Sequence, residues 1–204
     1  MRKIIFCNVA MREETTPLVY QSETPGLTLC EEAVTYPVLS CLGGYLQPED
    51  SVKIVLLCKC DPQKRYLRNV KTFKAEFQER CGPVRELSYV LVNTEFAECR
   101  LATEKLLSDL ADQCEPGAEI ISDITYGPKT LPIVLLAALS FGIRHLDCKV
   151  QHVFYGQVYF QDGAPTAPKL YDLSYLLYLN SLIYTLQCGS PEKAKQTLDM
   201  LLQL

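Results

Sequence analysis

The sequence has no uninterrupted apolar run of about 18 residues, the length that a membrane-spanning helix needs. It also has no low-complexity tract, and a net charge of only −4. A chain this close to neutral is not expected to bind duplex nucleic acid, although a local basic pocket for a small anion remains compatible with it. We therefore expect an ordered globular protein with neither membrane nor duplex partners.

Several functional motifs are missing. The chain contains neither the GxxxxGK[ST] spacing of a P-loop nor the GxGxxG fingerprint of dinucleotide-binding folds. Two histidines and one CxC pattern at residues 58–60 give no zinc-ligand spacing, so we expect no metal. There is no secretory signal, and ten cysteines are too sparse for a small disulfide scaffold, which favours a cytoplasmic location.

What is present is an alternation of strand and helix patterns over 204 residues. Apolar, strand-like runs occupy residues 2–7, 51–58, 86–92 and 118–124, and helical patterns occupy residues 61–79, 93–113 and 131–141. This alternation predicts an α/β fold: a Rossmann-like, mostly parallel sheet with helices on both faces. Late strands at 149–155 and 157–160, with a connection across 163–168, predict an antiparallel edge.

We expect a single domain over residues 1–204, with a core at 1–160 and a C-terminal helical extension at 170–204. The extension contains a tyrosine-rich helix at 174–187 and a last helix with Ser190 as N-cap and Pro191 at its first position. The cations on the helix at 61–79 are interpreted as a solvated face rather than a binding surface, because acidic residues are interspersed among them.

The most informative stretch is residues 118–141, in which a buried strand and an apolar helix flank a turn at 125–130. Thr130 is the expected N-cap of this helix, with Pro132 in the first turn. This turn is expected to bind phosphate for three reasons: the unpaired backbone N–H groups at the helix start, the positive end of the helix dipole, and the cation of Lys129. An ordinary strand-to-helix connection with a solvated lysine fits the spacing equally well.

Residues 123–132, DITYGPKTLP, resemble the D-[IV]-T-x-G-x-[KR]-x-x-P signature of CARF domains, the CRISPR-associated Rossmann-fold sensors, in the Csx1/Csx2 and TM1812-like branch. Tyr155-Gly156 and Tyr171-Asp172 support the resemblance. It implies binding of a cyclic oligoadenylate of four or six units, the second messenger of type III CRISPR antiviral signalling. Because such a ring is symmetric, it also implies a homodimer with the ligand on its two-fold axis.

In this family the loop after the first strand forms a second wall of the pocket. Asn8 is the candidate there, since a carboxamide can donate to phosphate and accept from adenine, although an ordinary loop asparagine fits as well. The expected ligand-binding residues are Asn8, Val9, Ala10, Met11, Thr125, Tyr126, Gly127, Pro128, Lys129 and Thr130.

Three alternatives remain open. The chain lacks the R-x(4–6)-H motif of a HEPN ribonuclease, so we expect a sensor that regulates a fused or separate effector, with no cofactor. A stand-alone ring nuclease would cleave the messenger slowly by 2′-hydroxyl attack, with Lys129 stabilising the developing charge as its catalytic residue. The last alternative is a Rossmann-like nucleotide-cofactor enzyme or a protein-interaction module. In such an enzyme Asp61 is the only acidic residue after the second strand that is placed to bind the ribose. His145 and His152 are interpreted as structural.

Overall fold

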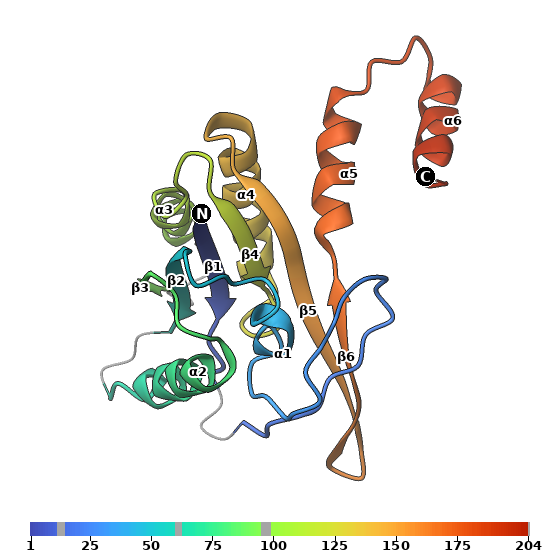
Figure 1. The fold of residues 1–204 in the computed structure, drawn as a ribbon. Helices are drawn as coiled ribbons and strands as arrows, with labels where there is room; N and C mark the ends of the chain where they lie inside the picture. Colours follow the sequence, from blue (N-terminus) through green and yellow to red (C-terminus); the bar gives the residue numbers. More distant parts are fainter. Residues whose placement is uncertain (12–14, 60–62, 95–98, 204) are drawn as a thin grey trace.

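The computed structural model describes residues 1–11, 15–59, 63–94 and 99–203 (Figure 1). Its strands are β1 (Arg2–Asn8), β2 (Ser51–Cys58), β3 (Glu86–Asn93), β4 (Glu119–Asp123), β5 (Lys149–Gln161) and β6 (Ala164–Asp172). Its helices are α1 (Leu39–Leu42), α2 (Tyr66–Arg80), α3 (Arg100–Ala111), α4 (Thr130–His145), α5 (Ser174–Thr185) and α6 (Pro191–Leu201). The expected α/β class is confirmed.

The strands form one six-stranded sheet in the order β3-β2-β1-β4-β5-β6. Every neighbouring pair is parallel except β5 and β6, which pair antiparallel at the edge, as expected. The chain moves outward from β1 through β2 to β3 and then returns to the other side of β1 with β4. The topological switch point therefore lies between β1 and β4, where ligands of open α/β sheets collect at the carboxyl ends of the strands.

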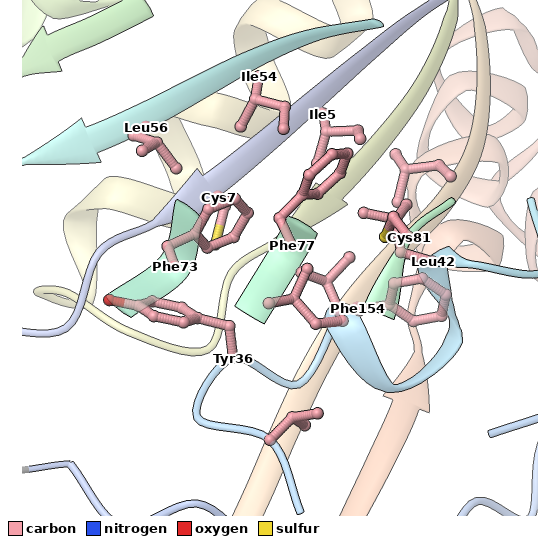
Figure 2. Packing of buried hydrophobic residues seen from close by; sticks show 14 of the residues in the cluster. Ile5, Cys7, Tyr36, Leu42, Ile54, Leu56, Phe73, Phe77, Cys81 and Phe154 are labelled. Carbon is pink, nitrogen blue, oxygen red and sulfur yellow. The ribbon is translucent and has the colours of Figure 1, made fainter. Parts of the chain in front are cut away.

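Alternate residues of the central strands pack against different layers. Ile5 and Cys7 of β1 join a core cluster with α2 and with the segment around Tyr36 (Figure 2). Ile4 and Phe6 face the opposite cluster, which includes residues of α3 and α4. Helices thus cover both faces, and a sheet buried on both sides explains why β1 and β2 are almost continuously apolar.

The edge hairpin differs from expectation. Residues 149–155 and 157–160 belong to one continuous strand, β5, and Gly156 lies inside it opposite Leu170 of β6. Residues 164–168, expected as a connection, are part of β6. The turn is shorter than predicted and uses Asp162 and Gly163, both with positive φ, 52° and 80°. Gly156 therefore does not end a strand. It lies inside β5, where a glycine often marks the close approach of another segment.

Helix boundaries agree less well than the strands. Helix α2 begins at Tyr66 rather than 61, and α3 begins at Arg100 rather than 93; residues 60–62 and 95–98 lie outside the described part of the chain. The expected start of α6 is confirmed, because the Lys193 N–H donates to Ser190 Oγ at 3.3 Å and Pro191 follows the cap. None of the helices in the described ranges is both long and apolar enough to cross a membrane.

Candidate functional site

The candidate site lies at the carboxyl ends of β1 and β4. Cys7 pairs in register with Asp123, so Asn8 and the turn that follows Asp123 leave the sheet side by side. Two loops that are more than a hundred residues apart in sequence therefore share one region of the molecule. They do so at the switch point of the sheet.

Asp123 is the first residue of the signature and is completely buried. Its Oδ2 accepts the Val38 N–H at 3.0 Å, and its Oδ1 accepts the Thr125 N–H at 2.8 Å. Burial raises the pKa of Asp123, while the hydrogen bonds from Thr125 and Val38 act in the opposite direction. The carboxyl group therefore joins the start of the turn to the loop before α1 and does not face solvent.

Asn8 holds the middle of the turn. Its Nδ2 donates to the Tyr126 carbonyl oxygen at 2.8 Å, and the whole residue is buried. Asn8 Oδ1 is also buried and accepts no hydrogen bond from the described residues. The Tyr126 hydroxyl donates to the Thr35 carbonyl oxygen at 2.7 Å, and its ring lies edge-on to Tyr36 with centroids 5.7 Å apart. Both ends of Tyr126 are thus fixed.

Thr125 fixes the turn to the neighbouring strand β5. Its Oγ1 accepts the Gly156 N–H at 2.8 Å. A Cβ atom at Gly156 would lie 2.5 Å from Pro37 Cγ and 3.2 Å from Thr125 Oγ1, so only glycine fits between these two residues. The sequence singled out Gly156 only through the resemblance; its physical role comes from this three-way contact.

The turn ends in the start of α4. Gly127 has φ of 99°, a left-handed conformation that glycine adopts without strain. Lys129, rather than Thr130, is the N-cap, so that prediction is wrong; Pro132 lies in the first turn as expected. The N-cap side chain makes no capping hydrogen bond within the described residues, and the first turn has no acidic residue. Lys129 and Thr130 are exposed.

Beside this turn is a cavity of about 450 Å³, which we call the tyrosine cavity. Its described lining residues are Ala10, Met11, Thr15, Thr16, Leu18, Tyr20, Thr125, Tyr126, Gly127, Tyr155, Gly156, Val158, Phe160 and Pro165. None of these described residues is charged. Aromatic faces, hydroxyls and backbone groups form a surface suited to a neutral, planar ligand group.

A second, smaller hollow lies on the other side of residues 10–11, between the ends of β1 and β2 and the start of α2. We call it the α2 cavity, and its volume is about 200 Å³. Its described lining residues are Val9, Ala10, Met11, Lys59, Arg65, Tyr66 and Asn69. In contrast to the tyrosine cavity, it contains two cationic side chains.

The predicted site residues fall into three groups. Ala10, Met11, Thr125, Tyr126 and Gly127 line the tyrosine cavity, whereas Val9, Ala10 and Met11 line the α2 cavity. Four predicted site residues are not among the described lining residues of either cavity: Asn8, Pro128, Lys129 and Thr130. Direct ligand contacts of all the predicted site residues stay predictions.

Apart from Tyr155-Gly156, which supported the resemblance, no sequence pattern indicated the other walls of the tyrosine cavity. Residues 15–20 come from a loop without periodicity, and residues 155–165 were expected to form only a sheet edge. The two histidines line neither cavity: His152 Nδ1 lies 2.7 Å from Asp172 Oδ2, and the His145 ring packs on Phe141.

Within the described ranges no group of three or more His, Cys, Asp or Glu side chains is placed to hold a metal ion. Cys60 of the CxC pattern and Asp61, the candidate ribose ligand, lie outside the described residues.

Comparison of the chain with models of known protein families and with curated protein sequences found no match.

Proposed function

We propose that this protein is a CARF-type sensor that binds a cyclic oligoadenylate and takes part in type III CRISPR antiviral signalling. The observation that carries the proposal is the position of the signature turn: Thr125, Tyr126 and Gly127 form one wall of the tyrosine cavity at the switch point of the sheet.

The chemistry of the cavity fits part of such a ligand. Adenine is planar and neutral, and it stacks on aromatic side chains while its edge forms hydrogen bonds. Tyr155 and Phe160 supply exposed rings, and Thr125 supplies a hydroxyl. The adjacent start of α4 contributes a positive dipole end and the exposed Lys129, both of which favour a phosphate group.

The symmetry of the ligand determines the proposed assembly. A ring of four or six adenylates presents identical phosphates around an axis, so two copies of one site can contact it from opposite sides. We therefore propose a homodimer with the ring on the two-fold axis and one tyrosine cavity on each side. The bound state would then regulate an effector domain or a separate effector protein.

A thermal-shift and calorimetry panel tests the proposal. We expect cyclic tetra-adenylate or cyclic hexa-adenylate to raise the Tm, because a ligand that binds only the folded state stabilises it. NAD and ATP at equal concentration should have little effect. A shift with NAD or ATP and none with either ring would instead favour a nucleotide-cofactor enzyme.

The same samples distinguish a sensor from a ring nuclease. Chromatography of the ligand after incubation with EDTA should recover intact rings if the protein only binds them. Gradual appearance of linear products ending in a cyclic phosphate would indicate metal-independent attack by the ribose 2′-hydroxyl.

A further inference from the structure

The two C-terminal helices bury very little of their own surface. Helices α5 and α6 have 12 and 11 residues and are joined by residues 186–190; we call residues 174–202 the helical hairpin (Figure 1). Within these two described helices only Leu177 is buried, and the Tyr178 hydroxyl, which donates to the Val150 carbonyl oxygen at 2.6 Å, fixes α5 to β5. Isolated helices shorter than about 12–15 residues are marginal in water, so this hairpin needs a further packing surface.

The exposed surface of the helical hairpin is apolar over both helices. Helix α5 has no charged residue, and a helix that is apolar on all sides is normally buried. The large apolar side chains that are exposed on the hairpin are Tyr175, Leu176, Tyr178, Leu182, Ile183, Tyr184, Met200 and Leu202. Their exposed fractions correspond to on the order of 800 Å², which is about what each partner of a stable interface buries. A monomer rarely leaves so much apolar surface in contact with water.

Helix α6 has the pattern of a helix that pairs with a copy of itself. Its less exposed residues recur at spacings of three and four and form one stripe: Ala194, Thr197, Leu198 and Leu201. Lys195 and Asp199 are exposed and lie two residues before and two residues after Thr197. In an antiparallel pair of α6 helices centred there, Lys195 of one copy lies opposite Asp199 of the other, and this contact occurs twice. The uncharged α5 adds no repulsion between the copies.

The helical hairpin extends away from the tyrosine cavity. Strand β6 runs antiparallel to β5, and α5 continues in that direction, so Tyr178 lies beside Val150 near the start of β5. The cavity is lined by residues 155–165 towards the other end of β5, and none of its described lining residues belongs to the hairpin. A contact between two hairpins therefore leaves both cavities open to a ligand.

From these observations we infer that the helical hairpin packs against the same hairpin of a second copy of this chain, in an antiparallel four-helix interface that forms without ligand. Four helices around a shared apolar core are a stable arrangement. The inference deepens the proposed function and rests on it only for the ring that the dimer binds. It assigns the surface that joins the two copies, and it makes the dimer exist before the ligand arrives.

The first test measures the mass of the full chain without ligand, by light scattering and sedimentation over a dilution series. Leu182→Glu places one unpaired carboxylate from each copy in the interface, and we expect it to weaken dimerisation roughly a hundredfold or more. The control is Leu101→Glu, the same change at an exposed leucine of α3, which should stay within about twofold of the wild type. Circular dichroism melting curves establish that each variant folds.

The second test reverses charges on the exposed face of α6, where the fold of the chain is not disturbed. Lys195→Glu and Asp199→Lys each oppose like charges twice across the two-fold axis, so each alone should dimerise several-fold more weakly at low salt. An equimolar mixture of the two variants pairs opposite charges again and should regain the affinity of the wild type. A mixture that dimerises no better than its components would refute the antiparallel contact.

Failure of the interface and failure of the proposed function give different results. A wild type that is monomeric without ligand refutes the interface, and the sensing function stands if cyclic tetra-adenylate or cyclic hexa-adenylate then binds. A wild-type dimer that Leu182→Glu leaves intact refutes the hairpin as the contact. If the dimer dissociates as expected in the variants but the wild type binds neither ring, the interface stands and the sensing function fails.

Discussion

At the scale of single residues, the signature turn is held by side chains that face inward. Asp123 is buried and bonded to backbone N–H groups on two segments, and Asn8 is buried and bonded to the Tyr126 carbonyl. Thr125 accepts a hydrogen bond from Gly156 of β5. These residues position the wall of the tyrosine cavity, and in the proposed complex its exposed rings and the start of α4 would contact the ligand.

Gly156 tests this arrangement without involving a ligand. In Gly156→Ala the new methyl group would lie 2.5 Å from the rigid ring of Pro37, so the loop or the strand must move. We expect the free energy of unfolding to fall by about 1–3 kcal/mol, as for other overpacked sites. Urea unfolding measures it, and Gly189→Ala is the control, because nothing lies within 4 Å of a Cβ at that position.

If Gly156→Ala and Gly189→Ala proved equally stable, the close contact between β5 and the loop at Pro37 would not exist in solution.

Lys129 tests the predicted phosphate contact at the start of α4. Lys129→Ala should weaken binding of the cyclic oligoadenylate by about 1.5–3 kcal/mol, since a charge-assisted hydrogen bond is lost. Because Lys129 is exposed, its removal should leave the Tm of the free protein almost unchanged. Calorimetry measures the affinity of Lys129→Ala for the ring, with Lys71→Ala as the control. An affinity of Lys129→Ala equal to that of the wild type would refute this contact.

At the scale of elements, the junction of β6 and α5 depends on one carboxylate. Asp172 Oδ1 accepts the N–H groups of Val153 and Ser174, at 3.2 Å and 2.9 Å, and Asp172 Oδ2 faces His152 Nδ1 at 2.7 Å. Burial alone would raise the pKa of Asp172, but the hydrogen bonds from His152, Ser174 and Val153 together outweigh it, so its pKa is lowered.

The lowered pKa predicts a pH dependence of stability. A carboxylate whose folded pKa lies below its unfolded value of about 3.9 stabilises the fold above that pH. This contribution is lost as the pH falls through the unfolded value towards the folded one. Urea unfolding from pH 7 to pH 3 should therefore show that Asp172→Asn is less stable than the wild type at pH 7 and that the difference shrinks below about pH 4.

The control is Asp162→Asn, which removes the same charge in the exposed turn between β5 and β6, where φ is 52° and asparagine is well tolerated. A stability difference for Asp172→Asn that did not change with pH would contradict the role of the charged form.

At the scale of the whole molecule, the surface is not evenly polar. Helix α5 contains no charged residue, and only Leu177 of it is buried; Figure 1 shows α5 and α6 beside the layered core. Tyr184 and Tyr175 are 75% and 60% exposed. Extensive exposed apolar surface is typical of proteins that associate.

The proposed assembly predicts a definite stoichiometry. Light scattering after size exclusion should give twice the chain mass of 23.0 kDa, and calorimetry should give one ring bound per two chains. The physical reason is that a ring on a two-fold axis is shared by both sites. A monomer that binds one ring per chain would contradict the assembly while leaving ligand recognition intact.

The sequence by itself determined the fold class and most of the strands. Apolar runs located β1, β2 and β4 to within a residue or two, and local cap chemistry located the start of α6, because these features depend on neighbouring residues. The strand-helix alternation also determined that the sheet is mostly parallel. It placed Asn8 and the signature turn at the same edge of the sheet.

Only the tertiary structure decided what surrounds that turn. Thr125 contacts Gly156, which is distant in sequence. Each of the two cavities is likewise lined by residues from distant segments, such as Tyr20 and Tyr155 in one and Met11 and Arg65 in the other. Hydrophobic periodicity reports which face of an element is buried, but not which other element covers it. The division of the site into an uncharged cavity and a cationic one follows from the order of strands in the sheet, which no local pattern encodes.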